Sequence, residues 1–265
     1  MIGRVINLDR APERWASISR VAAERGLAIE RVPAVDGRDP AALAAAAAAR
    51  DSGQSPAEIA CFESHRVVWR AIATGEAPLG LVLEDDIYLG AGVVEVLEAL
   101  VPATAGLDLV KLNAHPRGML VHALPVAEVA GRRLLRPAQR TSDSSGYVIT
   151  RDFAGRALAL HDGYRAALDV ALFDPATGAR VAQVEPAVTI QQRYADFRFL
   201  DEGARRTDIQ PDRTARRPRV GALTAARREA ERFWRRRLVP AAQPLLNLGR
   251  APEERLAFRR IGFEG

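Results

Sequence analysis

Short apolar runs alternate along this chain with longer segments whose apolar residues recur at helical spacing. The runs lack the polar alternation of a strand with one face in water, so they predict strands covered on both faces. We expect such strands at residues 4–8, 28–35, 79–83, 107–113 and 145–150, and half of a hairpin at 131–137. Strands that alternate with helices predict an α/β fold with a mostly parallel central sheet.

Helical periodicity predicts four main helices, at residues 11–26, 55–76, 93–100 and 151–160, and the alanine-rich residues 41–49 predict a fifth. The helix at 55–76 has the clearest start, because Ser55 and Glu58 form a capping box around Pro56. Its apolar face carries a histidine, His65, beside Trp69. A lone histidine in such a place is usually a packed core residue.

The regular pattern ends near residue 200, so we expect one domain at 1–200 and an extension at 201–265. The extension starts as a linker rich in proline, glycine and arginine. Residues 222–238 then predict a basic amphipathic helix with Phe233 and Trp234 on its apolar side. Three roles stay open for this helix: a solvated surface, contact with an anionic membrane, or contact with nucleic acid.

Composition narrows the class of protein. With 265 residues, 48% of them hydrophobic, the chain can bury a sizeable core. The formal charge is +5, and Cys61 is the single cysteine, which excludes an intrachain disulfide and a cysteine-based zinc site. No run approaches the roughly 20 apolar residues that span a bilayer, and the first residues do not resemble a secretion signal. We therefore expect a cytoplasmic protein.

The strand at 79–83 runs directly into three acids, Glu84, Asp85 and Asp86. Ligands of open α/β sheets bind beyond the carboxyl ends of the strands. In an extended segment, Glu84 and Asp86 would point to one face and Asp85 to the other. Two carboxylates on one face suit Mn²⁺ or Mg²⁺. A solvated acidic turn and a phosphoacceptor pocket are the alternatives at this point.

Four segments in this order resemble glycosyltransferase family 25: "INLDRAPER", "PAVDGR", "AEIACFESHRVVW" and "LEDD". Weaker matches follow in "SSGYVIT", "LDVALF" and "VEPAVTIQQ", so the resemblance covers roughly residues 1–200. The family has glycines where this chain has Ala57 and Ala60. The resemblance implies a GT-A-like fold, a UDP-sugar donor, usually UDP-galactose, and an inverting transfer to a growing saccharide such as lipopolysaccharide.

The resemblance also assigns expected roles to individual residues. Glu84 and Asp86 would bind the cation, and Asp85 would face the donor sugar or ribose. The catalytic base would be Asp169, with Asp143 as second choice, and His65 is a further catalytic candidate. The remaining donor-site candidates are Asn7, Asp9, Arg10, Arg14, Asp36 and Gln191, with Asp208 as a late contributor.

Two of these residues have simpler alternative roles. Asp169 could cap the segment that follows it, and Arg14 could lie on a solvated helix face. An enzyme that extends lipid-linked saccharide works at the cytosolic membrane face, so we prefer membrane contact for the basic tail and expect no nucleic-acid partner. A non-catalytic glycosyltransferase-like binding protein is the main alternative function.

Overall fold

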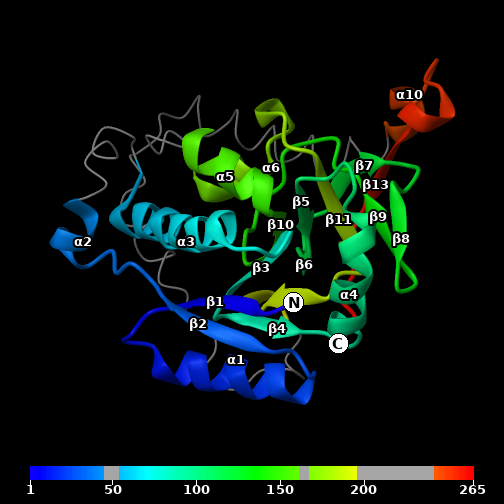
Figure 1. Ribbon diagram of the computed structural model, residues 1–265. Helices are drawn as coiled ribbons and strands as arrows, with labels where there is room; N and C mark the ends of the chain where they lie inside the picture. The colour runs from blue at the N-terminus through cyan, green and yellow to red at the C-terminus, as the bar shows by residue number, and fades with distance from the viewer. Residues whose placement is uncertain (45–53, 161–166, 196–241) are drawn as a thin grey trace.

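The computed structural model describes residues 1–44, 54–160, 167–195 and 242–265 and is built around an eight-stranded sheet (Figure 1). The strand order is β2-β1-β3-β10-β5-β11-β9-β8. The strands are β1 (Gly3–Asn7), β2 (Ile29–Pro33), β3 (Leu79–Glu84), β5 (Leu109–Lys111), β8 (Ala127–Val129), β9 (Arg132–Leu135), β10 (Gly146–Thr150) and β11 (Val181–Glu185). Six of the eight run in one direction, and β9 and β10 run in the other. The expected mostly parallel sheet is confirmed, with two reversed strands within it.

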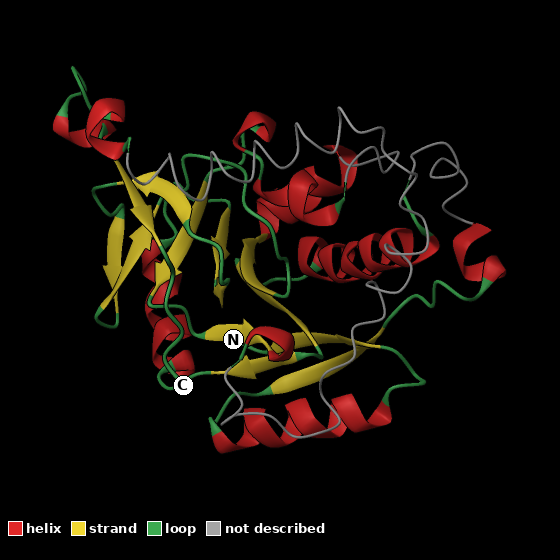
Figure 2. Cartoon of the chain, turned by 180° about the vertical axis from the view of Figure 1, so that it is seen from behind, coloured by secondary structure: helices red, strands yellow, loops and turns green. Residues whose placement is uncertain are grey.

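Helices cover both faces of this sheet. Figures 1 and 2 show α1 (Pro12–Glu24) on one side of β1–β3 and α3 (Pro56–Thr74) on the other. The first side also packs α4 (Val93–Ala103), and the second packs α5 (Arg151–Leu160) and α6 (Leu168–Phe173). Neighbouring strand residues divide between the two cores, as Val5 and Ile6 do. This division explains why central strands such as β3 and β10 read as apolar runs, whereas the edge strand β2 contains Glu30 and Arg31.

Two small sheets extend the molecule. The first has the order β4-β12-β6 and consists of β4 (Ile87–Leu89), β6 (Asn113–Ala114) and β12 (Thr189–Gln191). The second pairs β7 (Met119–His122) with β13 (Leu256–Arg259). A third apolar cluster joins Val121, Ala257 and Ile261. The last described residues of the chain therefore pack against the domain.

The remaining helical elements are short: α2 (Pro40–Ala44), α10 (Gln243–Leu246) and the 3₁₀ turns η2 (Pro175–Thr177), η3 (Gln192–Tyr194) and η7 (Pro252–Glu254). The rest of the expected alanine-rich helix, the basic helix at 222–238 and Asp208 lie outside the described residues. The boundary near residue 200 stays a prediction. In the described part of the chain, no helix is both long and apolar enough to cross a membrane.

The sequence expectations match the main elements. All five expected strands and all four main helices are present, and the capping box of Ser55 and Glu58 forms at the start of α3. Two details differ. The expected strand at 107–113 is divided into β5 and β6, and the acids of residues 84–86 do not form an extended segment, because β4 begins directly after them.

Candidate active site

A cavity of about 360 Å³ opens at the carboxyl ends of β1, β2 and β3. The chain passes from β1 to β2 on one side and then to β3 on the other side of β1. Such a reversal of strand order is the usual ligand site of an open α/β sheet. The first half of α3 forms the opposite wall. The structure therefore has a cavity at the place where the site was expected.

The turn after β2 is fixed against the start of α3. A side chain at Gly37 would lie 2.9 Å from the backbone oxygen of Pro56, so the close approach requires glycine. Ser64 accepts a hydrogen bond from the Val35 amide (2.9 Å) and donates one to the Ala60 carbonyl (2.7 Å). Two of the motifs, "PAVDGR" and "AEIACFESHRVVW", thus meet at the cavity wall. Ala57 and Ala60 both line the cavity.

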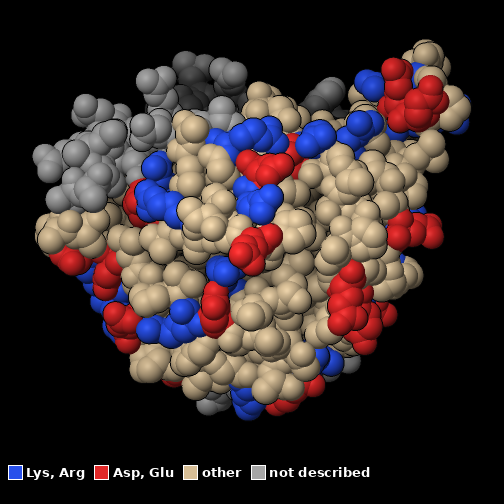
Figure 3. All heavy atoms as spheres, in the orientation of Figure 1, with Lys and Arg blue, Asp and Glu red and all other residues tan. Residues whose placement is uncertain are grey.

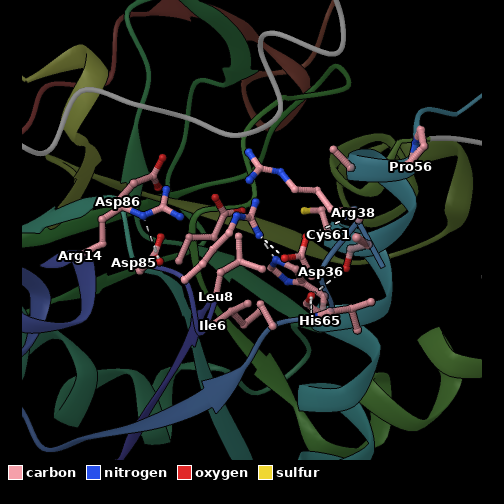
Figure 4. A pocket seen from close by; sticks show the side chains of 18 residues that line it. Ile6, Leu8, Arg14, Asp36, Arg38, Pro56, Cys61, His65, Asp85 and Asp86 are labelled. Carbon is pink, nitrogen blue, oxygen red and sulfur yellow. Dashed lines mark hydrogen bonds and ion pairs between the residues drawn. The ribbon is translucent and has the colours of Figure 1, made fainter. Parts of the chain in front are cut away.

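The three consecutive acids separate at the turn between β3 and β4. Asp85 turns toward β1 and α1, where Asn7 Nδ2 donates to its Oδ2 (2.6 Å) and Arg14 Nε lies 3.3 Å from the same oxygen. Glu84 turns toward α3, and its Oε1 lies 3.6 Å from His65 Nε2. Figure 4 shows Arg14, Asp85 and Asp86 on one side of the cavity and His65 on the other. The expectation of an extended segment was wrong, because two residues suffice to turn the chain into β4.

Asp85 has a nearby cation, but its two neighbours have less compensation. Asp86 is 8% exposed, and its Oδ1 has no hydrogen-bond partner among the described residues. Burial and the neighbouring carboxylates raise the pKa of Glu84 and of Asp86 to about 8. Gln191 Nε2 lies 3.5 Å from Glu84 Oε2. Carboxylate oxygens without full counter-charge fit a hard divalent cation, which would offset their repulsion.

A fourth acid, Asp143, lies close enough to raise the pKa of Glu84 by its charge. Its backbone has the left-handed φ of 76°, uncommon outside glycine. Lys111 holds this loop, because its buried ammonium donates to the carbonyls of Ser142 (3.0 Å) and Asp143. Asp143 Oδ1 accepts from the Ser145 amide (3.0 Å), whereas Oδ2 is buried with no partner in the described part of the chain.

Asp169, the first choice for the base from sequence, lies behind Asp143. Its Oδ1 accepts from the Val170 amide (2.9 Å), but the N-cap of α6 is Ala167, which has no side-chain cap hydrogen bond, so Asp169 does not cap this helix. Its Oδ2 accepts from the Asp143 amide at 3.3 Å. The geometry therefore favours Asp143 over Asp169 as the acid that faces the cluster.

Most of the donor-site candidates lie at the acids or at the cavity, and one does not. Asn7, Arg14 and Gln191 contact the acids, and Arg10 lines the cavity and pairs with Asp36. The side chain of Arg14 is only 12% exposed, so the solvated-face alternative was wrong. Asp9 lies apart, because its side chain is 82% exposed and pairs with Arg31 (2.6 Å).

Sequence reasoning missed three residues at the site. Arg38 lines the cavity directly after the "PAVDG" turn, and the position itself was the available signal. Arg31 Nε donates to Asn7 Oδ1 (2.7 Å), a contact between neighbouring strands. Tyr147 lies in the quoted "SSGYVIT" segment, and its hydroxyl oxygen is 2.8 Å from His65 Nδ1. His65 is fully buried, as in the core-histidine alternative, yet it faces Glu84.

Comparisons with known proteins agree with the motifs. The model of glycosyltransferase family 25 (LPS biosynthesis protein) matches residues 3–172. The chain is 28% identical to the lacto-N-neotetraose biosynthesis glycosyltransferase LgtB of Neisseria meningitidis serogroup B, over 89% of this chain and 97% of that protein. It is 27% identical to LgtE of Neisseria gonorrhoeae, over 80% of this chain and 82% of that protein.

Among solved structures, the inositol-1-phosphate CTP transferase of T. maritima aligns with 76% of this chain and 72% of its own, at 11% identity. The TM-score of 0.38 is too low to support a conclusion. The family match covers more than half of the chain, and both curated relatives are glycosyltransferases, which decides against the non-catalytic alternative. The chain belongs to glycosyltransferase family 25 and is a glycosyltransferase.

Proposed function

We propose that the protein transfers a hexose, expected to be galactose, from a UDP-sugar to a saccharide acceptor with inversion at the anomeric carbon, on a GT-A-like fold. The donor would bind in the cavity at the ends of β1, β2 and β3. Glu84 and Asp86 would hold Mn²⁺ or Mg²⁺. A bound cation would neutralise the charge that develops on the leaving diphosphate.

One observation carries this proposal: buried acids without full counter-charge face a cavity that arginines also line. Asp86 Oδ1 has no hydrogen-bond partner among the described residues. Arg38 lies across the cavity, on the side of the turn after β2. Arg10 also lines the cavity and pairs with Asp36 of that turn. A nucleoside diphosphate with its cation matches both charges, because arginine binds phosphate oxygens and the cation binds carboxylates.

Asp85 and Asn7 would orient the donor rather than hold the cation. Asp85 Oδ2 already accepts from Asn7 and pairs with Arg14. Arg31 in turn donates to Asn7 Oδ1. These contacts hold the Asp85 side chain in place at the cavity wall, where it would face the donor sugar or ribose.

The transfer itself would be a single in-line displacement. The acceptor oxygen forms a bond to the anomeric carbon while the bond from that carbon to the diphosphate oxygen breaks and its electron pair leaves with UDP. The acceptor proton passes to Asp143 Oδ2, the oxygen that has no partner among the described residues. Lys111 and Asp169 hold the Asp143 backbone in place.

The acceptor would be a lipopolysaccharide or a related oligosaccharide. The family description names lipopolysaccharide biosynthesis, and the two relatives are named for lacto-N-neotetraose biosynthesis. On the face shown in Figure 3, basic and acidic side chains of the described residues are interspersed. By its basic, amphipathic sequence, the segment at 222–238, which lies outside the described residues, would contact an anionic membrane at the cytosolic face.

Calorimetric titration of UDP, with and without Mn²⁺, tests the proposal in wild type and in Asp86→Ala. We expect UDP to bind wild type with Mn²⁺ and to bind Asp86→Ala weakly. Asp152→Ala is the matched control, because Asp152 is 89% exposed on α5. Turnover of UDP-galactose against UDP-glucose then identifies the donor, and NMR of the product gives the anomeric configuration. Absence of UDP binding by wild type in both conditions would contradict the proposal.

A further inference from the structure

Three buried aromatic side chains form a continuous path to Glu84. Trp69 Nε1 donates to the Tyr147 hydroxyl oxygen (2.7 Å), and this oxygen lies 2.8 Å from His65 Nδ1. His65 Nε2 then faces Glu84 Oε1 at 3.6 Å. The side chains of Trp69, Tyr147 and His65 are fully buried. His65 and Tyr147 are also stacked, with ring centres 5.8 Å apart and an interplanar angle of 12°.

The indole of Trp69 determines the direction of these hydrogen bonds. An indole N–H can only donate, so the Tyr147 oxygen is its acceptor. The Tyr147 hydroxyl hydrogen then needs an acceptor of its own, because water does not reach a fully buried hydroxyl. Among the described residues, the other polar atom bonded to this oxygen is His65 Nδ1. Tyr147 therefore donates to His65 Nδ1.

The neutral ring of His65 then carries its hydrogen on the other nitrogen. Because Nδ1 accepts from Tyr147 and carries no hydrogen, the ring is in its neutral form. A neutral imidazole has one N–H, and when Nδ1 accepts, Nε2 is the donor. Nε2 has no hydrogen-bond partner among the described residues, and the carboxylate it faces is that of Glu84.

We propose that Trp69, Tyr147 and His65 form a one-directional hydrogen-bond relay that fixes the Nε2–H tautomer of His65 and so orients Glu84. The functional role of this relay rests on the proposed function, in which Glu84 binds the cation. The distance of 3.6 Å is longer than a hydrogen bond, and a shift of a few tenths of an ångström would close it. With Gln191 on Oε2, Glu84 has one donor near each oxygen. His65 is then a positioning residue and not the base.

The relay also argues against a metal site that includes the neighbouring Cys61. Ligand atoms of Cys61, His65 and Glu84 all lie within 4.8 Å of one another, which is a set that Zn²⁺ or Co²⁺ could use. Such a site needs the lone pair of His65 Nε2. That requirement reverses the tautomer and leaves the Tyr147 hydroxyl hydrogen without an acceptor. The intact relay therefore disfavours a metal at these three residues.

Two-dimensional ¹H–¹⁵N NMR of the histidine rings tests the relay directly, in protein free of metal and nucleotide. The chain has four histidines, and the spectrum of His65→Gln assigns the signals of His65. We expect Nε2–H in wild type and in Phe62→Leu, which perturbs the packing on Trp69 without removing a polar atom of the relay. Tyr147→Phe should lose this preference. An Nδ1–H tautomer in wild type, or an unchanged tautomer in Tyr147→Phe, would overturn the relay.

Mn²⁺-dependent UDP binding gives the functional readout. Tyr147→Phe should weaken Mn²⁺ affinity by about 10-fold, a usual effect of removing an outer contact of a ligand. His65→Gln keeps a donor toward Glu84 and should bind more tightly than His65→Leu; equal losses would overturn the positioning role. A Co²⁺–thiolate absorption band that disappears in Cys61→Ser and His65→Gln would also overturn it. If wild type fails to bind UDP while its tautomer is Nε2–H, the proposed function fails and the relay stands.

Discussion

The carboxylate of Asp108 and the carboxylates at the cavity have opposite surroundings. Asp108, just before β5, accepts from the amide and guanidinium of Arg180 (2.9–3.1 Å) and from Arg156. Burial alone would raise its pKa, but the hydrogen bonds from Arg180 and the charges of both arginines lower it below the ordinary value. At the cavity, burial and like charge raise the pKa of Glu84 and Asp86.

The difference separates a structural acid from a ligand site. Asp108 has its counter-charge within the chain, so it stabilises the fold without help. Asp86 and Asp143 each keep a buried oxygen with no partner among the described residues, so they need a cation, a substrate or a proton. Substitutions at these acids test this distinction.

The largest effect is expected for Asp86→Asn, which keeps the shape of the side chain and removes its charge. Turnover with UDP-sugar and acceptor should fall by about 10³-fold, because the leaving diphosphate loses its stabilising cation. Initial rates at saturating Mn²⁺ measure this effect, with the exposed Asp152→Asn as control. A loss below tenfold would remove Asp86 from the cation site.

Asp143→Asn should reduce turnover by about 10²-fold, the usual contribution of a positioned base. UDP binding in the presence of Mn²⁺ should change little, which separates Asp143 from the cation site. Asp169→Asn, which alters only the support of the Asp143 backbone, should have the smaller effect. A larger loss in Asp169→Asn than in Asp143→Asn would restore Asp169 as the base.

Asp108→Asn should destabilise the protein by about 1–3 kcal/mol, because hydrogen bonds to a charged group are lost. The lower half of this range is expected, since the side chains of Arg156 and Arg180 are 52% and 59% exposed. Urea unfolding followed by circular dichroism measures the change. Turnover below the unfolding transition should stay at the wild-type level, and a specific loss of activity would contradict a purely structural role.

The smallest effect concerns pH. Because the pKa of Asp108 is lowered by folding, its carboxylate stabilises the native state above the ordinary aspartate pKa. This stability is lost as pH falls through the lowered pKa of the folded protein. The difference in unfolding free energy between wild type and Asp108→Asn should therefore be constant near neutral pH and shrink below about pH 4. A difference that grows with acid would show that Asp108 is protonated in the native state.

Much of this arrangement could be predicted from the sequence, because strands buried on both faces leave unbroken apolar runs. The place of the acids at the end of β3 followed from the same runs. The directions of the individual acid side chains could not be predicted in this way. The strand that follows them, Ile87–Leu89, is too short to show a strand pattern in the sequence, and the turn at Asp85 and Asp86 depends on its pairing with β12.

Contacts between residues far apart in the chain could not be predicted from the sequence either. The order of Asp143 and Asp169 depends on a left-handed backbone at Asp143 and on Lys111, which lies 32 positions earlier in the chain. Helical spacing placed Arg14 on α1 but could not show that Asp85 lies against it, 71 positions later. Tyr147 is part of the site because β10 pairs with β3, which brings its hydroxyl within hydrogen-bond distance of His65 on α3.

The most direct test of the central distinction compares melting temperatures of wild type, Asp86→Asn and Asp108→Asn, with and without Mn²⁺ and UDP. Without ligands, we predict that Asp86→Asn is at least as stable as wild type and that Asp108→Asn melts several degrees lower. With both ligands, wild type and Asp108→Asn should gain stability, and Asp86→Asn should not. A role of Asp86 as a cation ligand would be contradicted if Asp86→Asn melted lower than wild type and still gained stability from Mn²⁺ and UDP.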